Sequence, residues 1–274
     1  KKILSFARMA PNGLANPMAP KCVEFNMSFL PFDIVSIDPT RIGLVVLQSD
    51  ETIERDMMQM RGTADLFFSR VPSGQEVTAE TLQSMARHIE ASAALFPQTL
   101  RFNAVGYGCT SGTAQIGVQE IDRLVKSGTK TRAVSQPVSA LVAACQHLKL
   151  KRIAFLSPYL EEVSANLRQV LQQNGVETPV FGTFGEAEES KVVRISGASV
   201  RSAARHLLAG GVLDGIFLSC TNLRTMDLIA PMEAELGLPV LSSNLVLAWH
   251  LAQLSGDPQA LQGPGQLFAA QAVK

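Results

Sequence analysis

The sequence predicts an α/β fold with two similar parallel-sheet domains related by a pseudo-twofold axis. Short apolar runs without alternation recur along the chain, as is typical of strands buried on both faces of a parallel sheet, and amphipathic segments of helical period separate them. Two of these runs are followed by the same dipeptide, Cys-Thr, at Cys109 and Cys220. The same distance, 68 residues, separates Arg41 from Cys109 and Arg152 from Cys220. A constant offset between repeated features is the sequence form of a pseudo-twofold.

The first repeat opens with an apolar run that ends in the polar segment 48–52. A Ser or Asp in this segment can cap a helix, and its acidic residues suit the first helical turn. The predicted strands of this repeat are 41–47, 64–69 and 103–105, and the predicted helices are 51–60, 78–95 and 114–125.

A further helix is predicted to start at Pro137, because proline fits the first turn of a helix. Its apolar face includes Val138, Leu141 and Cys145, so Cys145 is interpreted as a core residue. The second repeat then has predicted strands at 153–156, 180–181, 216–218 and 239–241, helices at 161–173, 200–208, 226–236 and 245–254, and a short docked helix at 267–270.

Residues 1–40 do not fit the repeat and are interpreted as an N-terminal extension that lies over the fold or over a neighbouring subunit. Its apolar stretch, residues 3–7, is too short for a signal peptide. We expect the first α/β domain to span 41–136 and to be completed by 245–274, and the second to span 137–244. Cys22 falls in the extension and is expected to be structural or incidental.

Composition excludes several classes of protein. With 274 residues, of which 46% are hydrophobic and 18% charged, the chain can form one large or two medium domains. The 24 basic residues balance 24 acidic ones, which argues against nucleic-acid binding. No apolar run approaches the roughly 20 residues that a membrane helix needs.

The chain has no pattern for a metal or a nucleotide. The four cysteines form no Cys-x-x-Cys pair and the four histidines show no ligand spacing. No glycine-rich dinucleotide or phosphate-binding motif follows a strand. The sequence therefore predicts no metal and no cofactor, and the low cysteine density is typical of a reducing, cytoplasmic compartment.

The two Cys-Thr turns carry the predicted chemistry. Each lies at the carboxyl end of a strand, where ligands bind in open parallel sheets. The pseudo-twofold would bring both turns to an active site in the cleft between the domains, facing one substrate. Short polar groups beside the thiols suit an anionic oxygen such as a carboxylate; they belong to Thr110, Ser111, Thr221 and Asn222.

Two facing cysteines permit two reactions without a cofactor. Each cysteine is predicted to lie just before a helix, whose N-terminus lowers a thiol pKa and favours a partly thiolate population. A thiolate that removes a proton from one face of a carbon, with a thiol that donates one to the other face, gives racemisation. A thiolate that adds to an activated double bond and is later eliminated gives cis–trans isomerisation.

These motifs resemble those of the aspartate/glutamate racemase superfamily. The resemblance covers residues 41–255 and is carried by Gly106-Tyr107-Gly108-Cys109-Thr110-Ser111-Gly112-Thr113, by Ser157-Pro158-Tyr159 and by Ser219-Cys220-Thr221-Asn222-Leu223-Arg224-Thr225. It is strongest for the branch that holds maleate cis–trans isomerases and arylmalonate decarboxylases, and within it for the racemase-like ectoine-utilisation proteins. This resemblance implies two similar α/β domains, a site between them, and no metal or organic cofactor.

The resemblance also implies roles for individual residues. Cys109 and Cys220 fall on the two catalytic thiols, and Tyr159 on a tyrosine that contacts substrate in the isomerases. The carboxylate-binding turns of the family fall on Thr110, Ser111, Thr221 and Asn222. Arylmalonate decarboxylases have a small residue in place of the first thiol, so decarboxylation fits this chain less well.

One departure from the family bears on the substrate. Maleate isomerases have an Asn after the first strand, where this chain has Ser49-Asp50, and their second Asn corresponds to Ser164. An anionic Asp50 would repel a dicarboxylate. It favours a substrate with an ammonium or amidinium group, unless Asp50 only caps a helix, and both interpretations stay open.

The sequence therefore predicts a racemase or isomerase that acts on a small carboxylate, an amino acid or an ectoine-derived compound. The alternatives are a maleate cis–trans isomerase, an arylmalonate-type decarboxylase and a non-catalytic carboxylate-binding protein on the same scaffold. No nucleic-acid or membrane partner is expected, and a homodimer is the expected oligomer.

Overall fold

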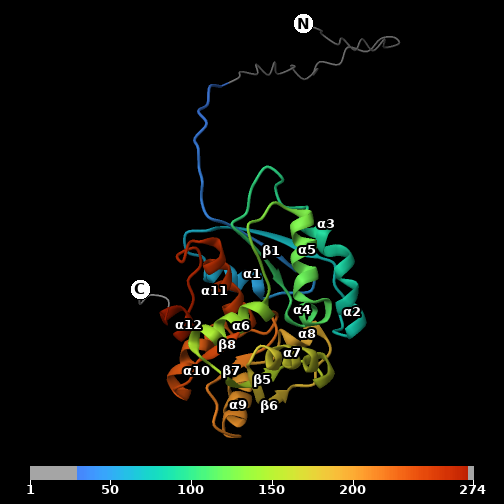
Figure 1. Ribbon diagram of the computed structural model, residues 1–274, viewed down its shortest axis with the longest axis vertical. Helices are drawn as coiled ribbons and strands as arrows, with labels where there is room; N and C mark the ends of the chain where they lie inside the picture. The colour runs from blue at the N-terminus through green and yellow to red at the C-terminus, as the bar shows by residue number, and fades with distance from the viewer. Residues whose placement is uncertain (1–29, 271–274) are drawn as a thin grey trace, which may run out of the picture. The chain divides into compact units, whose positions relative to one another are not determined.

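Two four-stranded parallel sheets form the frame of the computed structural model, which describes residues 30–270. Their strand orders are β2-β1-β3-β4 and β6-β5-β7-β8, so the second sheet repeats the topology of the first. Figure 1 shows where the strands of the second sheet, β5 to β8, lie among the helices. The first sheet consists of β1 Arg41–Leu47, β2 Asp65–Val71, β3 Ala104–Gly108 and β4 Val134–Ser135; the second consists of β5 Arg152–Ser157, β6 Glu177–Thr183, β7 Gly215–Leu218 and β8 Val240–Ser242. The predicted fold class is confirmed.

The central strands of both sheets are buried on both faces. All five residues of β3 and all four of β7 are buried, which explains why their sequences do not alternate between apolar and polar. In the registers of the two sheets, Val46 pairs with Gly108 and Leu156 pairs with Leu218. The chain leaves both central strands at the same edge of its sheet, and this edge positions the two cysteines.

Helices cover the first sheet and lead into the second. They are α1 Ile53–Gln59, α2 Ala79–Ser84, α3 Ala86–Ala93, α4 Thr110–Ile116, α5 Val118–Gly128 and α6 Pro137–Leu148. Pro137 occupies the first turn of α6, and Cys145 is fully buried on that helix, as predicted.

The second sheet is covered by α7 Glu161–Gln173, α9 Gly197–Leu208 and α10 Ile229–Leu236. The remaining elements are α8 Glu189–Val192, the 3₁₀ helix η1 Met226–Leu228, α11 Ser243–Ser255 and α12 Gln266–Ala269. None of the helices within residues 30–270 combines the length and the apolar composition needed to cross a membrane.

Helix α11 returns from the second sheet to the first. It follows β8 directly but packs on β3 and β4, and it also packs against α6. Residues 38–270 belong to one compact unit, so the boundaries at 41–136, 137–244 and 245–274 stay a prediction. Residues 30–37 belong to a separate unit and are exposed. Residues 1–29 of the predicted extension, with Cys22, lie outside the described residues.

Two predicted helices are each divided in two. The segment 114–125 breaks at Gly117, whose φ is +97°, between α4 and α5. The segment 78–95 forms two helices, α2 and α3, which are separated at Met85. Thr78 caps α2 as the pattern suggested, since its hydroxyl accepts the Thr81 N–H. Met85 is buried, and its sulfur lies 3.8 Å from the Tyr107 hydroxyl. The break lets Leu82 face the pocket described below while α3 packs on the sheet.

Candidate active site

Cys109 is held at the start of α4 in extended backbone. Its φ is −150°, and it is the N-cap residue of the helix, with its sulfur accepting the Gly112 N–H at 3.1 Å. The predicted placement of this thiol at a helix N-terminus is therefore confirmed. Gly112 leaves room for this approach, because a Cβ there would come within 2.8 Å of the sulfur.

Cys220 is held in a strained turn instead. Its φ is +100°, a conformation that residues with a side chain rarely adopt, and no helix starts at the next residue. The next helical element, η1, begins only at Met226. The prediction that Cys220 lies just before a helix is therefore wrong, because the chain turns back so that the Asn222 N–H reaches the Cys220 sulfur at 3.2 Å. The predicted helix 226–236 itself is present as η1 and α10.

Both thiols line one small buried pocket. It brings together five further residues that the sequence predicted, namely Asp50, Thr110, Ser111, Tyr159 and Thr221. It also includes four residues that the sequence did not indicate, namely Leu47, Val77, Leu82 and Glu189. The cavity volume is about 10 Å³, the room of about one water molecule. Seven of the ten predicted site residues therefore meet, in a closed arrangement.

Three predicted residues do not line this pocket. Ser49 lies 3.1 Å from the Ser73 hydroxyl, and Ser164 donates to the Ser157 hydroxyl at 2.8 Å. Asn222 lies behind the lining, where its amide accepts the Glu51 N–H and donates to the Glu189 carboxylate at 2.8 Å. The contacts of Asn222 indicate that it positions Glu189.

A single hydroxyl joins the two cysteine turns. Ser243, at the start of α11, is fully buried and its oxygen accepts both the Thr110 hydroxyl at 2.8 Å and the Cys220 backbone N–H at 3.0 Å. The turns also meet where the Thr221 hydroxyl donates to the Gly108 carbonyl oxygen at 3.3 Å. These bonds fix the relative position of the two thiols.

Glu189 forms a hydrogen-bonded chain with Tyr159 and Cys220. The Tyr159 hydroxyl lies 2.7 Å from Glu189 Oε1 and 2.9 Å from Cys220 Sγ. All three residues are buried. Sequence reasoning missed Glu189 because it follows Glu186 and Glu188 in an acidic run that resembles a solvated surface.

Asp50 combines a capping role with a free oxygen. Its Oδ1 accepts the backbone N–H groups of Thr52 at 2.7 Å and Ile53 at 2.8 Å, so the predicted cap exists. Its Oδ2 is buried and has no hydrogen-bond partner among the described residues. Burial raises the pKa of Asp50. The nearby Arg70 does not pair with this carboxyl; it bonds the Asp50 carbonyl oxygen and forms an ion pair with Glu54.

Burial raises the pKa of both thiols in the free protein. Burial raises the pKa of Cys109 to about 12, and the charges of Glu189 and Asp50 act in the same direction against the Gly112 N–H. Burial also raises the pKa of Cys220, again with Glu189 adding to the effect. The predicted lowering of the thiol pKa values is therefore wrong, because desolvation and two carboxyl groups outweigh one helix terminus.

The pocket is closed by a short pairing of two loops. The loop before α2 and the loop before α8 meet in an antiparallel bridge between Glu76 and Glu188. Two backbone bonds support it, from Val77 N–H to the Ala187 oxygen at 3.0 Å and from Glu189 N–H to the Gln75 oxygen at 3.1 Å. We call this pairing the strap. It places Val77 and Glu189 in the pocket lining.

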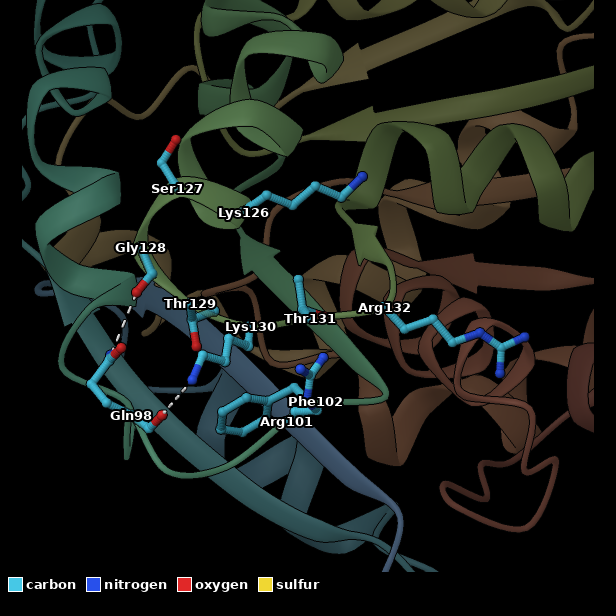
Figure 2. Close-up of a pocket in the computed structure, with 10 residues that line it drawn as sticks. All are labelled: Gln98, Arg101, Phe102, Lys126, Ser127, Gly128, Thr129, Lys130, Thr131 and Arg132. Atoms are coloured by element: carbon cyan, nitrogen blue, oxygen red, sulfur yellow. Dashed lines mark hydrogen bonds between the residues drawn. The ribbon is translucent and has the colours of Figure 1, made fainter.

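A larger hollow lies at the opposite edge of the first sheet (Figure 2). Its volume is about 540 Å³, and residues just before β3 and β4 line it, among them Phe102 and Thr131. Four of its lining residues are basic, namely Arg101, Lys126, Lys130 and Arg132. None of the predicted site residues lines this hollow. No cluster of three metal-ligating side chains occurs within residues 30–270.

Comparisons with known proteins identify the family of this chain. A family model described as arylmalonate decarboxylase matches residues 127–268, just over half of the chain. A maleate isomerase from Nocardia farcinica is 26% identical over 239 residues, which cover 83% of this chain and 95% of that protein. An arylmalonate decarboxylase from Bordetella bronchiseptica is 25% identical over 202 residues, which cover 73% and 82%.

Solved structures show the same fold. A maleate isomerase from Pseudomonas putida superposes with a TM-score of 0.74 at 18% identity, covering 84% of this chain and 98% of that one. The Nocardia farcinica maleate cis–trans isomerase, in a Cys-to-Ser variant with a covalently bound succinylcysteine intermediate, gives 0.72 at 24% identity, covering 83% and 97%.

Sequence, fold and the two thiols in one pocket agree with each other. The chain is an isomerase-type enzyme that belongs to the arylmalonate decarboxylase family, in the branch of the aspartate/glutamate racemase superfamily that also holds the maleate isomerases.

Proposed function

We propose that this protein is a cofactor-independent cis–trans isomerase of a small α,β-unsaturated carboxylate. The observation that carries the proposal is the convergence of Cys109 and Cys220 on one closed pocket. The similarity to maleate isomerases over most of the chain, and the succinylcysteine found in one of them, support the same chemistry.

The reaction needs one thiolate and one thiol. The thiolate adds to one alkene carbon, and the thiol of the other cysteine protonates the neighbouring carbon, which turns the double bond into a single bond. Rotation about that bond exchanges the two geometries. The second cysteine then takes its proton back as the carbon–sulfur bond breaks, so the enzyme returns to its starting state.

The pocket supplies donors for the charge that develops on the substrate carboxylate. The Ser111 hydroxyl lines the pocket beside Cys109, at the start of α4. A helix N-terminus and a hydroxyl both stabilise negative charge, and they act more strongly in a site that excludes water. The substrate carboxylate is therefore expected at the Cys109 turn.

Racemisation is the second candidate, and Asp50 favours it. The buried, unpartnered Oδ2 of Asp50 and the Glu189 carboxyl line the pocket, and none of the lining residues is a Lys or Arg. Such a pocket disfavours a dicarboxylate and suits a substrate with an ammonium group. An amino acid or an ectoine-derived compound would then exchange its α-proton between the two thiols.

Proton NMR in deuterated water separates these candidates. Maleate, the zwitterion cis-4-aminobut-2-enoate, acidic amino acids and ectoine hydrolysis products would each be incubated with the full chain. Conversion of a cis alkene to its trans isomer, lost in Cys109→Ala and in Cys220→Ala, is the expected result. Exchange of an α-proton without isomerisation would establish the racemase instead.

The buried Cys145 offers a matched control, because Cys145→Ala removes a thiol that lies outside the pocket. This variant should retain full activity. If no compound reacts while saturable binding survives in both pocket variants, the protein is a binding protein and the proposal fails.

A further inference from the structure

Cys220 and Glu189 lie at the two ends of a chain of hydrogen bonds whose middle member is Tyr159. The two contacts of the Tyr159 hydroxyl, 2.7 Å to Glu189 and 2.9 Å to Cys220, are both within proton-transfer distance. A phenol can donate to one neighbour while it accepts from the other. The chain therefore has two proton arrangements that share the same heavy-atom positions.

We propose that Glu189 is the base that ionises Cys220, with Tyr159 passing the proton between them. The thiol proton moves to the Tyr159 oxygen as the Tyr159 proton moves to Glu189 Oε1. The products are a Cys220 thiolate, a neutral Tyr159 and a Glu189 carboxylic acid. The proton stays inside the pocket, so no co-reactant is needed.

The surroundings of Glu189 favour this transfer. Asn222 donates to Oε2 at 2.8 Å and leaves Oε1 to face the Tyr159 hydroxyl. Glu189 is only 6% exposed, which limits competition from water for its proton. Burial and the charge of Asp50 raise the pKa of Glu189, which makes its carboxylate a stronger base than a surface one.

The other thiol lacks a link to a carboxylate, because the phenol beside Cys109, that of Tyr107, faces the Met85 sulfur instead. Cys109 Sγ accepts the Gly112 backbone N–H, and among the described residues no carboxylate is hydrogen-bonded to it. The two thiols therefore differ: among the described residues, only Cys220 is linked through a phenol to a carboxylate with which it can exchange its proton. The use of this exchange in catalysis rests on the proposed function, whereas the proton transfer itself does not.

Other charged groups near Cys220, Tyr159 and Glu189 do not replace Glu189 as the base. Cys109 and Asp50 face it across the pocket. Lys191, on the same helix as Glu189, pairs with Glu188, and Arg194 lies 3.6 Å from Glu51; both cations are more than half exposed.

The rate at which iodoacetamide alkylates Cys220 tests the transfer without any substrate. Mass spectrometry of the Cys220 peptide would give the rate for the full chain at a series of pH values. Because internal transfer consumes no bulk proton, the wild-type rate should become independent of pH once Glu189 is ionised. In Glu189→Gln the rate should keep rising about tenfold per pH unit, and at about pH 7 it should lie at least about tenfold below wild type.

Two variants separate proton transfer from simple electrostatics. Asp50→Asn also removes a negative charge, one that raises the pKa of both Cys220 and Glu189, but it leaves the hydrogen bonds of Tyr159 intact, so the rate should keep its pH-independent region. Glu188→Gln changes the neighbouring surface carboxyl and should have no effect. Tyr159→Phe should reproduce Glu189→Gln.

The outcomes decide between the two explanations. If Glu189→Gln speeds alkylation, or keeps the pH-independent region that Asp50→Asn keeps, Glu189 acts only as a charge and the proposal is wrong. A wild-type rate without a flat region, including no reaction at any pH, would also contradict it. Failure of the isomerase assay together with the expected alkylation profile would leave the transfer standing and overturn only the proposed function.

Discussion

The two cysteine turns occupy equivalent places in two sheets of the same topology, yet they hold their thiols differently. Cys109 caps a helix in relaxed backbone, whereas Cys220 sits at a φ of +100° and joins the Tyr159–Glu189 chain. The strand framework repeats, but the polar partners do not. The pseudo-twofold thus supplies two thiols facing one pocket, and the differences between the halves assign them separate tasks.

The largest expected effect comes from removing either thiol. Cys109→Ala and Cys220→Ala should each lower kcat by at least about 10³-fold, because neither addition nor protonation can proceed alone. Turnover of the unsaturated acid, followed by absorbance, measures this. The comparison predicts a second difference: Cys109→Ala should still form the Cys220 thiolate and be alkylated at that residue. Activity retained by either variant would contradict a two-thiol mechanism.

The hydroxyl that joins the two turns should have the next largest effect. Ser243→Ala leaves the Cys220 N–H and the Thr110 hydroxyl without their acceptor in a buried site. We expect kcat/KM to fall by about 10- to 100-fold, because positioning of the thiols is lost. Ser255→Ala, which alters a buried hydroxyl at the other end of α11, is the control. Equal activities would show that Ser243 does not set the thiol geometry.

The polar contacts at the ends of β4 and β8 should also differ in how acid changes their contribution to stability. At the end of β4, Ser135 lies 2.8 Å from His250 Nδ1, whereas at the end of β8 Ser242 caps α11. Burial lowers the pKa of His250 to about 4. A lowered histidine pKa contributes stability above its unfolded value of about 6.5. This contribution is lost as the pH falls towards 4.

Urea unfolding between about pH 4 and 7 would measure this loss, expected at about 2 kcal/mol. His250→Gln should flatten the curve, and His206→Gln, on an exposed position, should not. An unchanged slope in His250→Gln would assign the acid sensitivity to other groups.

The smallest expected effect concerns the backbone at Cys220. Glycine adopts positive φ without strain, so Cys220→Gly should be more stable than Cys220→Ala by about 1 kcal/mol. At Cys145, inside α6, the order should reverse, with the glycine variant less stable by about 1 kcal/mol. Thermal unfolding of the four variants checks this. The same order at both positions would mean that the Cys220 turn relaxes without strain.

The sequence predicted the repeat more fully than the site. Apolar runs and the 68-residue offset between Arg41 and Cys109 depend on local order, so both sheets and the meeting of Cys109 with Cys220 could be predicted. The positive φ at Cys220 could not, because the turn is set by contacts with Ser243, which lies 23 residues further along the chain. Glu189 contacts Tyr159 although 30 residues separate them in the sequence, and hydrophobic periodicity does not predict such a contact.

A sequence motif alone does not predict the pKa of a buried thiol. A cysteine before a helix suggests a low thiol pKa, and that signal was correct for the position of Cys109 but wrong for its pKa. The opposing carboxyls come from β1–α1 and from α8, elements distant in sequence. Local patterns therefore locate a nucleophile, and tertiary packing determines its ionisation.

The strap has a consequence for the timing of the reaction. With about 10 Å³ of free volume, the pocket has no room for a small carboxylate in its closed arrangement. Opening the pairing of Glu76 with Glu188 would widen it, and the residence time of the product would then depend on loop backbone bonds rather than on the thiols. Evolution could tune the throughput of such an enzyme in these loops while leaving every reacting group unchanged.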